Sequence, residues 1–348
     1  MKRARGPSRA RRGVCRAREG GWLPAALLLA LVTPGLAFAQ QADSSSDAPT
    51  AVAQASAPPP STPPAGAEAS APASTMPAAS AASAAPPPDK SGFTLFNPTP
   101  AADLRPFCTD RPTKASSPCT VDAGYFQIES DVFNVTIAHA AGVSSDVYVI
   151  TDPTLKLGLT NTVDLEVSIA PYEIITTRDR DGVSTRQGGI GDLFVHVKWN
   201  LLGDDGGNVS FAISPYVKVP TAPLGIGDGA VEGGGIAILN INLPKGWSVT
   251  FEPEADLLED VSGQGTHLNV SGLASFSHPL SKEVTGSIEF WTDVDFDPIG
   301  DVTQVSGDLA LAWIPASQPT LQFDCGVNFG LNRETPIAQF YVGVSHRF

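Results

Sequence analysis

From about residue 122 to the C-terminus, apolar and polar side chains alternate in runs of about 8 to 14 residues. Clusters of Gly, Asn, Asp and Pro separate these runs, as they do between strands. One clear run interleaves Val163, Leu165, Val167 and Ile169 with Asp164, Glu166 and Ser168. The twelve runs lie at about residues 124–137, 146–159, 162–175, 190–202, 208–219, 231–243, 247–258, 267–278, 284–296, 302–314, 320–331 and 337–348. A period of two predicts strands with one apolar and one polar face, so we expect an all-β, antiparallel fold of about twelve strands.

Alternation alone does not distinguish a soluble β-sandwich from a transmembrane β-barrel, because both bury one face of every strand. The positions of the aromatic residues favour the barrel. With the N-terminus in the periplasm, the periplasmic strand ends carry Trp199, Trp247, Trp313 and Phe348, all on the apolar face. Membrane barrels typically gather aromatic side chains where the bilayer meets water. The sequence therefore predicts a transmembrane β-barrel over residues 122–348.

The lengths of the predicted connections agree with this topology. Bacterial barrels keep their periplasmic connections short and carry longer ones outside. The two longest predicted connections, residues 176–189 and 220–230, both lie on the outer side. Pro171, Pro215 and Pro253 fall inside predicted strands and count against them, since proline removes a ladder donor. A bulge near the outer rim accounts for the first two but not for Pro253, which is nearer mid-strand.

The first 39 residues are typical of a secretory signal peptide. Eight Lys or Arg residues within the first 20 positions precede an apolar run, residues 22–38, which ends in the small-residue site Ala37-Phe38-Ala39. We expect cleavage between Ala39 and Gln40. The remaining sequence has no further run of 18 apolar residues, which excludes a helical membrane span in the mature chain.

Cleavage would leave a strongly acidic protein. The full chain has a formal net charge of −14, and residues 1–39 carry eight basic residues and one acidic residue, so about −21 remains. Nucleic acid is therefore excluded as a partner, because binding its phosphates requires a basic surface.

Two segments separate the signal peptide from the barrel. Positions 40–89 hold 17 Ala, 11 Pro and 9 Ser and almost no aromatic or branched apolar side chains, so they cannot bury enough surface to fold. We predict a disordered periplasmic tether over residues 40–92. Residues 93–121 form a bridge in which Cys108 and Cys119 are expected to form a disulfide in the oxidising periplasm. The bridge offers too few ligands for a metal, and the sequence indicates no cofactor.

The polar face of the predicted strands would line the lumen of the barrel. Its candidate pore-lining residues are Glu129, Asp131, Asp164, Glu166, His196, Lys198, Lys218, Glu252, Glu254, Asp256, Glu289, Asp293, Asp308 and Asp324. With Lys156, Glu232, Asp295 and Arg347, this face carries thirteen acidic side chains against four Lys or Arg. An aqueous lumen with that excess would concentrate cations and disfavour anions. Alternatively, acids and bases pair across a narrow lumen and close it, and a barrel of about twelve strands is compatible with either state.

The polar face also carries Tyr172, Tyr216, Trp291 and Tyr341, which either stack on an aromatic solute or fill the interior. The five histidines belong to no recognisable Ser–His or Asp–His motif. An enzyme of the hydrolase kind would need such a pair, so the sequence indicates that the protein is not an enzyme.

Six short motifs occur in order along the second half of the bridge and the barrel. They are Thr109-Asp110-Arg111-Pro112, Tyr125-Phe126-Gln127-Ile128-Glu129, Gly189-Ile190-Gly191-Asp192-Leu193, Pro215-Tyr216-Val217-Lys218-Val219-Pro220, Glu232-Gly233-Gly234 and Pro244-Lys245-Gly246-Trp247. As a set they resemble the transporter-like outer-membrane family associated with the meta pathway of phenol degradation, over essentially residues 105–348. The resemblance implies an outer-membrane barrel that passes small, often aromatic, compounds. The Ala/Pro-rich segment lies outside the family pattern.

These features predict a channel in the outer membrane of a Gram-negative bacterium, with lipid and small-molecule solutes, aromatic or hydrophobic compounds among them, as its partners. The last strand, with Gly343 and a terminal Phe348, is similar to the signal that outer-membrane barrels present to their assembly machinery. The alternative is a structural or adhesive barrel with a plugged lumen and no transport.

Overall fold

The structure, a computed structural model, describes residues 89–140 and 142–348. Its strands are β1 (Phe126–Ala140), β2 (Val143–Val149), β3 (Asp152–Gly158), β4 (Val163–Ile169), β5 (Glu173–Arg178), β6 (Ser184–Gly189), β7 (Leu193–Leu202), β8 (Val209–Val219), β9 (Glu232–Asn242), β10 (Ser248–Glu259), β11 (Thr266–Pro279), β12 (Val284–Asp295), β13 (Val302–Trp313), β14 (Leu321–Gly330) and β15 (Ala338–Arg347). Two 3₁₀ turns, η1 (Ala101–Asp103) and η2 (Pro244–Gly246), complete the elements of this part of the chain. No helix within it is long and apolar enough to span a membrane. The predicted signal peptide (1–39), its cleavage site and residues 40–88 of the predicted tether lie outside the described residues.

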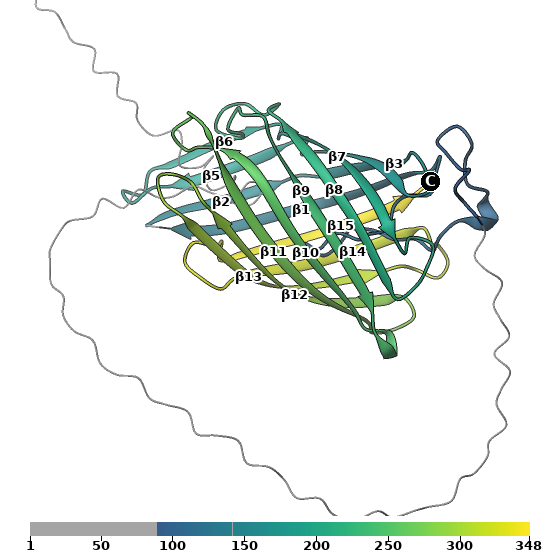
Figure 1. Ribbon diagram of the computed structural model, residues 1–348. Coiled ribbons are helices and arrows are strands. Elements are labelled where there is room, and N and C mark those ends of the chain that lie inside the picture. Colours follow the sequence, from purple (N-terminus) through teal and green to yellow (C-terminus); the bar gives the residue numbers. More distant parts are fainter. Residues whose placement is uncertain (1–88, 141) are drawn as a thin grey trace, which may run out of the picture. The chain divides into compact units, whose positions relative to one another are not determined.

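The strands form one antiparallel sheet that closes on itself (Figure 1). The last strand, β15, returns to pair with β1, so that Gln127 lies opposite Arg347. Three stretches of the wall are interrupted and contain two strands each: β2 and β3, β4 and β5, and β6 and β7. Counted as continuous stretches of wall, the fifteen strands therefore make a closed barrel of twelve, and the predicted fold is confirmed.

The three splits are connected to one another across the wall. Residues 150–151, 170–172 and 190–192 interrupt the three stretches. Main-chain hydrogen bonds join neighbouring interruptions, from Ile150 N to Tyr172 O (3.1 Å) and from Gly191 N to Ala170 O (2.8 Å). One interruption contains Pro171, which has no N–H to donate. The predicted bulge at this proline thus belongs to a wider break that crosses three stretches of wall.

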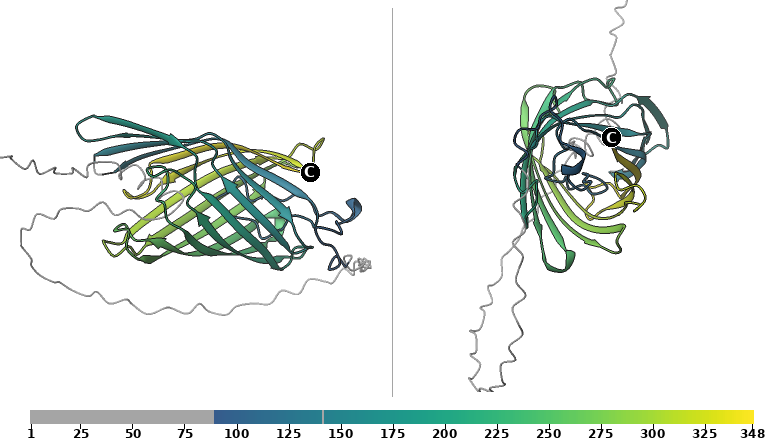
Figure 2. Two further views of the ribbon diagram at one scale, coloured as in Figure 1. Left: turned by 90° about the horizontal axis from the view of Figure 1, so that it is seen from above. Right: turned by 90° about the vertical axis from the view of Figure 1, so that its right-hand side faces the viewer.

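Beyond this break, β2, β5 and β6 continue the wall as an antiparallel extension (Figure 2, left). The prediction of a loop over residues 176–189 is wrong at both ends, because β5 runs to Arg178 and β6 begins at Ser184. The polar sequence of this hairpin carries little alternation, and its strands are defined by main-chain pairing with each other and with β2. The apolar core of the extension joins Val147 and Ile175 to Ile226 from the connection between β8 and β9.

Pro215 and Pro253 remain inside β8 and β10, with their side chains on the exposed outer face. Each proline removes ladder bonds without shifting the register. On the β7 side, pairing resumes from His196–Tyr216 to Trp199–Ile213 with the same offset. Pro253 is therefore tolerated mid-strand because its other edge stays paired, opposite Gly272.

The outer face of the barrel is apolar, and the inner face is charged. Trp199, Trp247, Trp313 and Phe348 are between 45% and 62% exposed, and all lie at the end of the barrel that carries the C-terminus, which we call the terminal end. The opposite end, called the loop end, carries the connection between β8 and β9. Many of the fully buried side chains are ionisable, among them Lys198, Glu289 and Asp164. A lipid-facing exterior and a polar interior are what a membrane barrel requires.

Cys325 tests this register directly, because it is the free thiol of the described residues and is exposed on β14, while its neighbour Asp324 is buried on the inner face. We expect N-ethylmaleimide, which enters bilayers, to label Cys325 in intact outer membranes, and a charged methanethiosulfonate to leave it unmodified over the same time. Mass spectrometry of the intact protein measures both. Rapid labelling by the charged reagent would contradict the assignment of this face to lipid.

Candidate functional site

The chain enters the barrel before its first strand. Residues 105–121, which we call the inserted segment, lie within the ring of strands when the barrel is viewed from the terminal end (Figure 2, right). A disulfide joins Cys108 to Cys119 inside this segment. The wall residues that bind it lie on strands around the barrel and include Glu129, Lys156, Asp164, Lys198, Glu252, Glu289, Asp308 and Asp324. The second half of the predicted bridge therefore occupies the lumen.

Arg111 attaches the inserted segment to one side of the wall. Its Nη1 lies 2.6 Å from Asp131 Oδ1, and its Nη2 lies 2.7 Å from Asp324 Oδ1. Burial alone would lower the pKa of Arg111, but the two carboxylates raise it above its ordinary value. Gly343 on β15 lies between these carboxylates, and a side chain there would collide with the guanidinium. Because residue 343 is glycine, the space beside it on β15 is free for the Arg111 guanidinium.

Asp110 attaches the segment to the other side of the lumen. Its carboxylate lies between the ammonium groups of Lys156 and Lys198, with 2.6 Å to the latter. The same lysines pair with the wall carboxylates of Glu129 and Glu166, each at 2.8 Å. Burial alone would raise the pKa of Asp110, but the two ammonium groups lower it below its ordinary value. A lowered pKa means that this attachment is present at neutral pH and weakens only as the pH falls through that lowered value.

The tip of the segment is held by main-chain donors. Lys114 N donates to Glu289 (2.8 Å), and Ser116 N donates to Glu252 (2.6 Å). The ammonium group of Lys114 reaches further into the lumen, where it donates to Ser306 Oγ (2.8 Å) and lies 4.3 Å from the ring centroid of Trp291. Carboxylates that accept such donors bind a chain strongly without needing a charged partner.

A further set of ion pairs fixes the entrance of the segment at the terminal end. Arg105 lies 3.3 Å from Asp122 and 2.5 Å from Asp204, which is in the connection between β7 and β8. Arg347, the last residue of β15, donates to the same Asp122 at 3.2 Å. Both ends of the inserted segment are therefore bound to the rim, and its disulfide loop points into the barrel.

All fourteen predicted pore-lining residues lie on the inner face, and they divide into two groups. Those that contact the inserted segment directly are Glu129, Asp131, Asp164, Lys198, Glu252, Glu289, Asp308 and Asp324. Glu166 contributes through Lys198. The others, which line cavities, are His196, Lys218, Glu254, Asp256 and Asp293. Most of the acidic side chains in the lumen thus contact the inserted segment, and the others face a cavity.

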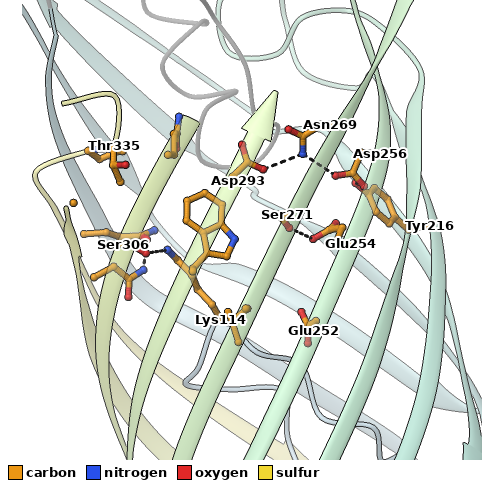
Figure 3. A pocket seen from close by; sticks show the side chains of 17 residues that line it. Lys114, Tyr216, Glu252, Glu254, Asp256, Asn269, Ser271, Asp293, Ser306 and Thr335 are labelled. Carbon is orange, nitrogen blue, oxygen red and sulfur yellow. Dashed lines mark hydrogen bonds between the residues drawn. The ribbon is translucent and has the colours of Figure 1, made fainter. Parts of the chain in front are cut away.

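Two cavities lie beside these side chains. The first, of about 200 Å³, is bounded by Trp291 and Tyr216 and by the carboxylates of Glu254, Asp256 and Asp293 (Figure 3). Residues of the β14–β15 connection, including Thr335, also line it. The second, of about 260 Å³, lies at the break in the wall and is lined by residues such as Glu173, Asp192, Phe194, His196 and Lys218.

The predicted lumen aromatics have different surroundings. Tyr216 stacks on His196 with ring centroids 4.8 Å apart and donates to Asp256 (2.7 Å). Trp291 borders the first cavity, whereas Tyr341 is buried on the inner face. Tyr172 is half exposed in the wall break. Two of the four therefore present a ring or hydroxyl to a cavity.

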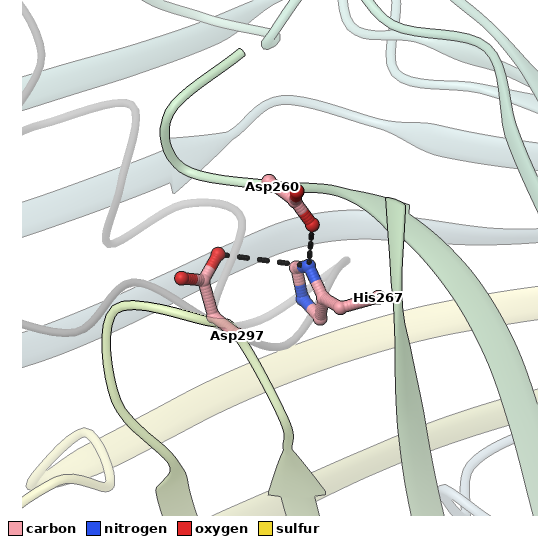
Figure 4. Close-up of side chains that lie close together, drawn as sticks. All are labelled: Asp260, His267 and Asp297. Atoms are coloured by element: carbon pink, nitrogen blue, oxygen red, sulfur yellow. Dashed lines mark hydrogen bonds and ion pairs between the residues drawn. The ribbon is translucent and has the colours of Figure 1, made fainter. Parts of the chain in front are cut away.

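One cluster at the loop end has the composition of a metal site. His267 Nδ1 lies 3.1 Å from Asp260 and 3.5 Å from Asp297 (Figure 4). Its Nε2 lies 2.7 Å from Asp295. One imidazole and two carboxylates at this spacing could hold a divalent cation. Both oxygens of Asp297 already accept main-chain N–H groups, which ties the β10–β11 connection to the β12–β13 connection without an ion.

Sequence reasoning missed the residues that place the segment in the lumen: Arg105, Asp110, Arg111, Lys114 and Ser116. They lie outside the alternating region, so strand periodicity carried no information about them. One signal was available. A short disulfide-closed loop with acidic and basic residues precedes a barrel whose polar face has unpaired acids and a few lysines, and such charges are complementary.

The closed wall, the apolar exterior, the aromatic terminal end and the charged interior together define a β-barrel of the outer-membrane type. A family model described as "putative MetA-pathway of phenol degradation" matches residues 109–348, and the chain belongs to this family. The match begins inside the inserted segment, so the lumen anchors Asp110 and Arg111 are part of it.

Two solved structures are similar to this chain. The COG4313 outer membrane channel from Pseudomonas putida F1 is similar over 68% of this chain and all of that chain, with 13% identity and a TM-score of 0.54. The translocator domain of the autotransporter NalP from Neisseria meningitidis is similar over 64% of this chain and 88% of that chain, with 15% identity and a TM-score of 0.41. A search of curated protein sequences found no significant match.

Proposed function

We propose that the protein is a passive outer-membrane channel for small cationic or neutral molecules, and that the inserted segment gates it. The observation that carries this proposal is the division of the lumen. Eight of the predicted pore-lining residues bind the inserted segment, while Glu254, Asp256 and Asp293 border a cavity that reaches Lys114 at its tip. A solute entering from the loop end would meet this acidic cavity first and the inserted segment next.

The charge of the cavity supports the preference for cations. Among the residues that line it, Glu252, Glu254, Asp256 and Asp293 are acidic, and Lys114 is the basic one. Negative charge in a confined, water-filled space raises the local concentration of cations and repels anions. Membership of the family and the rings of Trp291 and Tyr216 favour aromatic compounds among the solutes.

The orientation and the assembly route belong to the same proposal. We assign the terminal end to the periplasm, because bacterial barrels keep their termini and short turns there. The tether would then lie in the periplasm, and Phe348 would present the last strand to the barrel assembly machinery. Gly343, by contrast, already has a local role beside Arg111.

Planar-bilayer recording of the purified full chain tests the proposal. Under a potassium chloride gradient we expect small, discrete openings whose reversal potential has the sign of potassium selectivity. A reversal potential of the opposite sign would contradict the cation preference. A barrel that is folded, by its heat-dependent shift in gel mobility, but never conducts would contradict transport and favour the structural or adhesive alternative.

A further inference from the structure

The ammonium group of Lys114 occupies a site that is built for a cation. It lies 4.3 Å from the ring centroid of Trp291, within the range in which an indole face attracts a positive charge. It donates to Ser306 Oγ (2.8 Å) and lies 3.4 Å from Asp308. An aromatic face, a hydroxyl and a carboxylate thus surround one primary ammonium group, and that group belongs to the inserted segment.

The cavity beside this ammonium group contains more negative charge than Lys114 can neutralise. Asp293 is almost fully buried, and its Oδ2 has no hydrogen-bond partner among the described residues. Its other oxygen accepts from Asn269 (2.9 Å), which also donates to Asp256 (3.2 Å). Figure 3 shows these carboxylates and Glu254 on the wall of the cavity, which Trp291 also lines. A buried carboxylate oxygen without a donor favours a ligand that supplies one.

We propose that this cavity binds small primary amines that carry an aromatic or apolar group, and that Lys114 takes the position of the ammonium group when no amine is bound. The proposal deepens the proposed function by naming a class of solute for its acidic cavity. A primary ammonium group has three N–H donors for Asp293, Asp308 and Ser306. The ring of the amine would lie against Trp291 and Tyr216.

The size of the cavity favours a ligand with a single ring. Its volume of about 200 Å³ is below the roughly 300 to 1,000 Å³ of sites for drug-sized molecules. Binding would remove Lys114 from Trp291 and Ser306. The tip of the inserted segment would then lose one of its contacts with the wall, so the amine would favour release of the segment.

Calorimetric titration of the detergent-solubilised full chain with phenethylamine tests the site without requiring transport. We expect phenethylamine to bind and its neutral analogue 2-phenylethanol to bind at least roughly tenfold more weakly, because the alcohol cannot satisfy the carboxylates. Equal affinities for the two compounds would overturn the proposal.

Two variants distinguish this site from general attraction to an acidic protein. Lys114→Met removes the internal competitor and is expected to strengthen phenethylamine binding roughly tenfold, because the competent site is no longer occupied. Asp293→Asn is expected to weaken it roughly tenfold. The matched controls Lys282→Met and Glu334→Gln make the same charge changes at exposed positions and should leave the affinity unchanged. An affinity that Lys114→Met leaves unchanged would contradict the competition.

The outcome is separable from that of the channel proposal. A protein that conducts potassium but does not discriminate phenethylamine from the alcohol would refute the amine site alone. A protein that binds phenethylamine with the expected response to Lys114→Met but shows no conductance would refute transport and leave the site in place.

Discussion

The double variant Asp110→Ala/Arg111→Ala is expected to raise the open probability of the barrel about a hundredfold, since each of two buried charge-assisted attachments contributes about 1.5 kcal/mol or more. Bilayer recording measures it as a corresponding rise in mean current at a fixed voltage. These two residues bind opposite sides of the lumen, Asp110 to Lys198 and Arg111 to Asp131 and Asp324. Their loss would free the disulfide loop from both sides at once.

The wall should remain intact in this variant. Without Asp110, Lys156 and Lys198 still pair with Glu129 and Glu166. Asp131 and Asp324 lose Arg111, but water that enters the opened lumen solvates them. The newly exposed charges are mainly carboxylates, so the added current should be more cation-selective than that of the unmodified protein.

A matched control comes from the loop end, where Arg333 and Glu334 are exposed. Arg333→Ala/Glu334→Ala removes the same types of charge and should leave the current unchanged. If the Asp110/Arg111 variant folds yet conducts no more than the unmodified protein, the inserted segment does not limit the current.

The strands of the barrel wall could be predicted because the alternation that identifies a strand lies within that strand. Alternation between Asp164, Glu166 and their apolar neighbours determines which face meets lipid, and it does so within one strand. The aromatic residues at strand ends then indicate which way the strands run. Residues 176–189, which hold the end of β5 and all of β6, are predicted as a loop because they are mostly polar on both faces. Their structure depends on pairing with a neighbour, which local sequence does not report.

The inserted segment could not be predicted in the same way, because its position depends on long-range ion pairs. Asp110 and Lys198 are 88 residues apart in the chain, and Arg111 and Asp324 are 213 apart. The alternating polar face predicts an acidic lumen but does not decide whether acids and bases close it. The structure supplies a third arrangement, in which wall charges bind a segment from outside the strands. The lumen carboxylates could therefore be predicted from the sequence, but not that most of them bind the inserted segment.

Replacing the buried ammonium group of Lys198 should destabilise the protein more than any change to an exposed charge. Lys198→Met is expected to lower the free energy of unfolding by about 3 to 5 kcal/mol, the usual cost of removing one partner of a buried ion pair. Lys198 is 1% exposed and bridges Glu166 on the wall and Asp110 in the inserted segment. Methionine has a similar length, so the loss would come from charge and not from a cavity. The midpoint and slope of urea unfolding, followed by tryptophan fluorescence in detergent, give the free energy.

The reason for this cost can be tested by removing the carboxylate as well. In Lys198→Met/Glu166→Gln, Lys156 still pairs with Asp110 and Glu129, and residue 166 no longer carries the charge that Lys198 neutralised. We therefore expect the double variant to recover more than half of the lost stability, although it carries one substitution more. Lys282→Met, at an exposed position, should stay within about 0.5 kcal/mol of the unmodified protein. Equal destabilisation by the single and double variants would mean that Lys198 acts through packing, and the charge balance of the lumen would then not be what holds the inserted segment and the wall together.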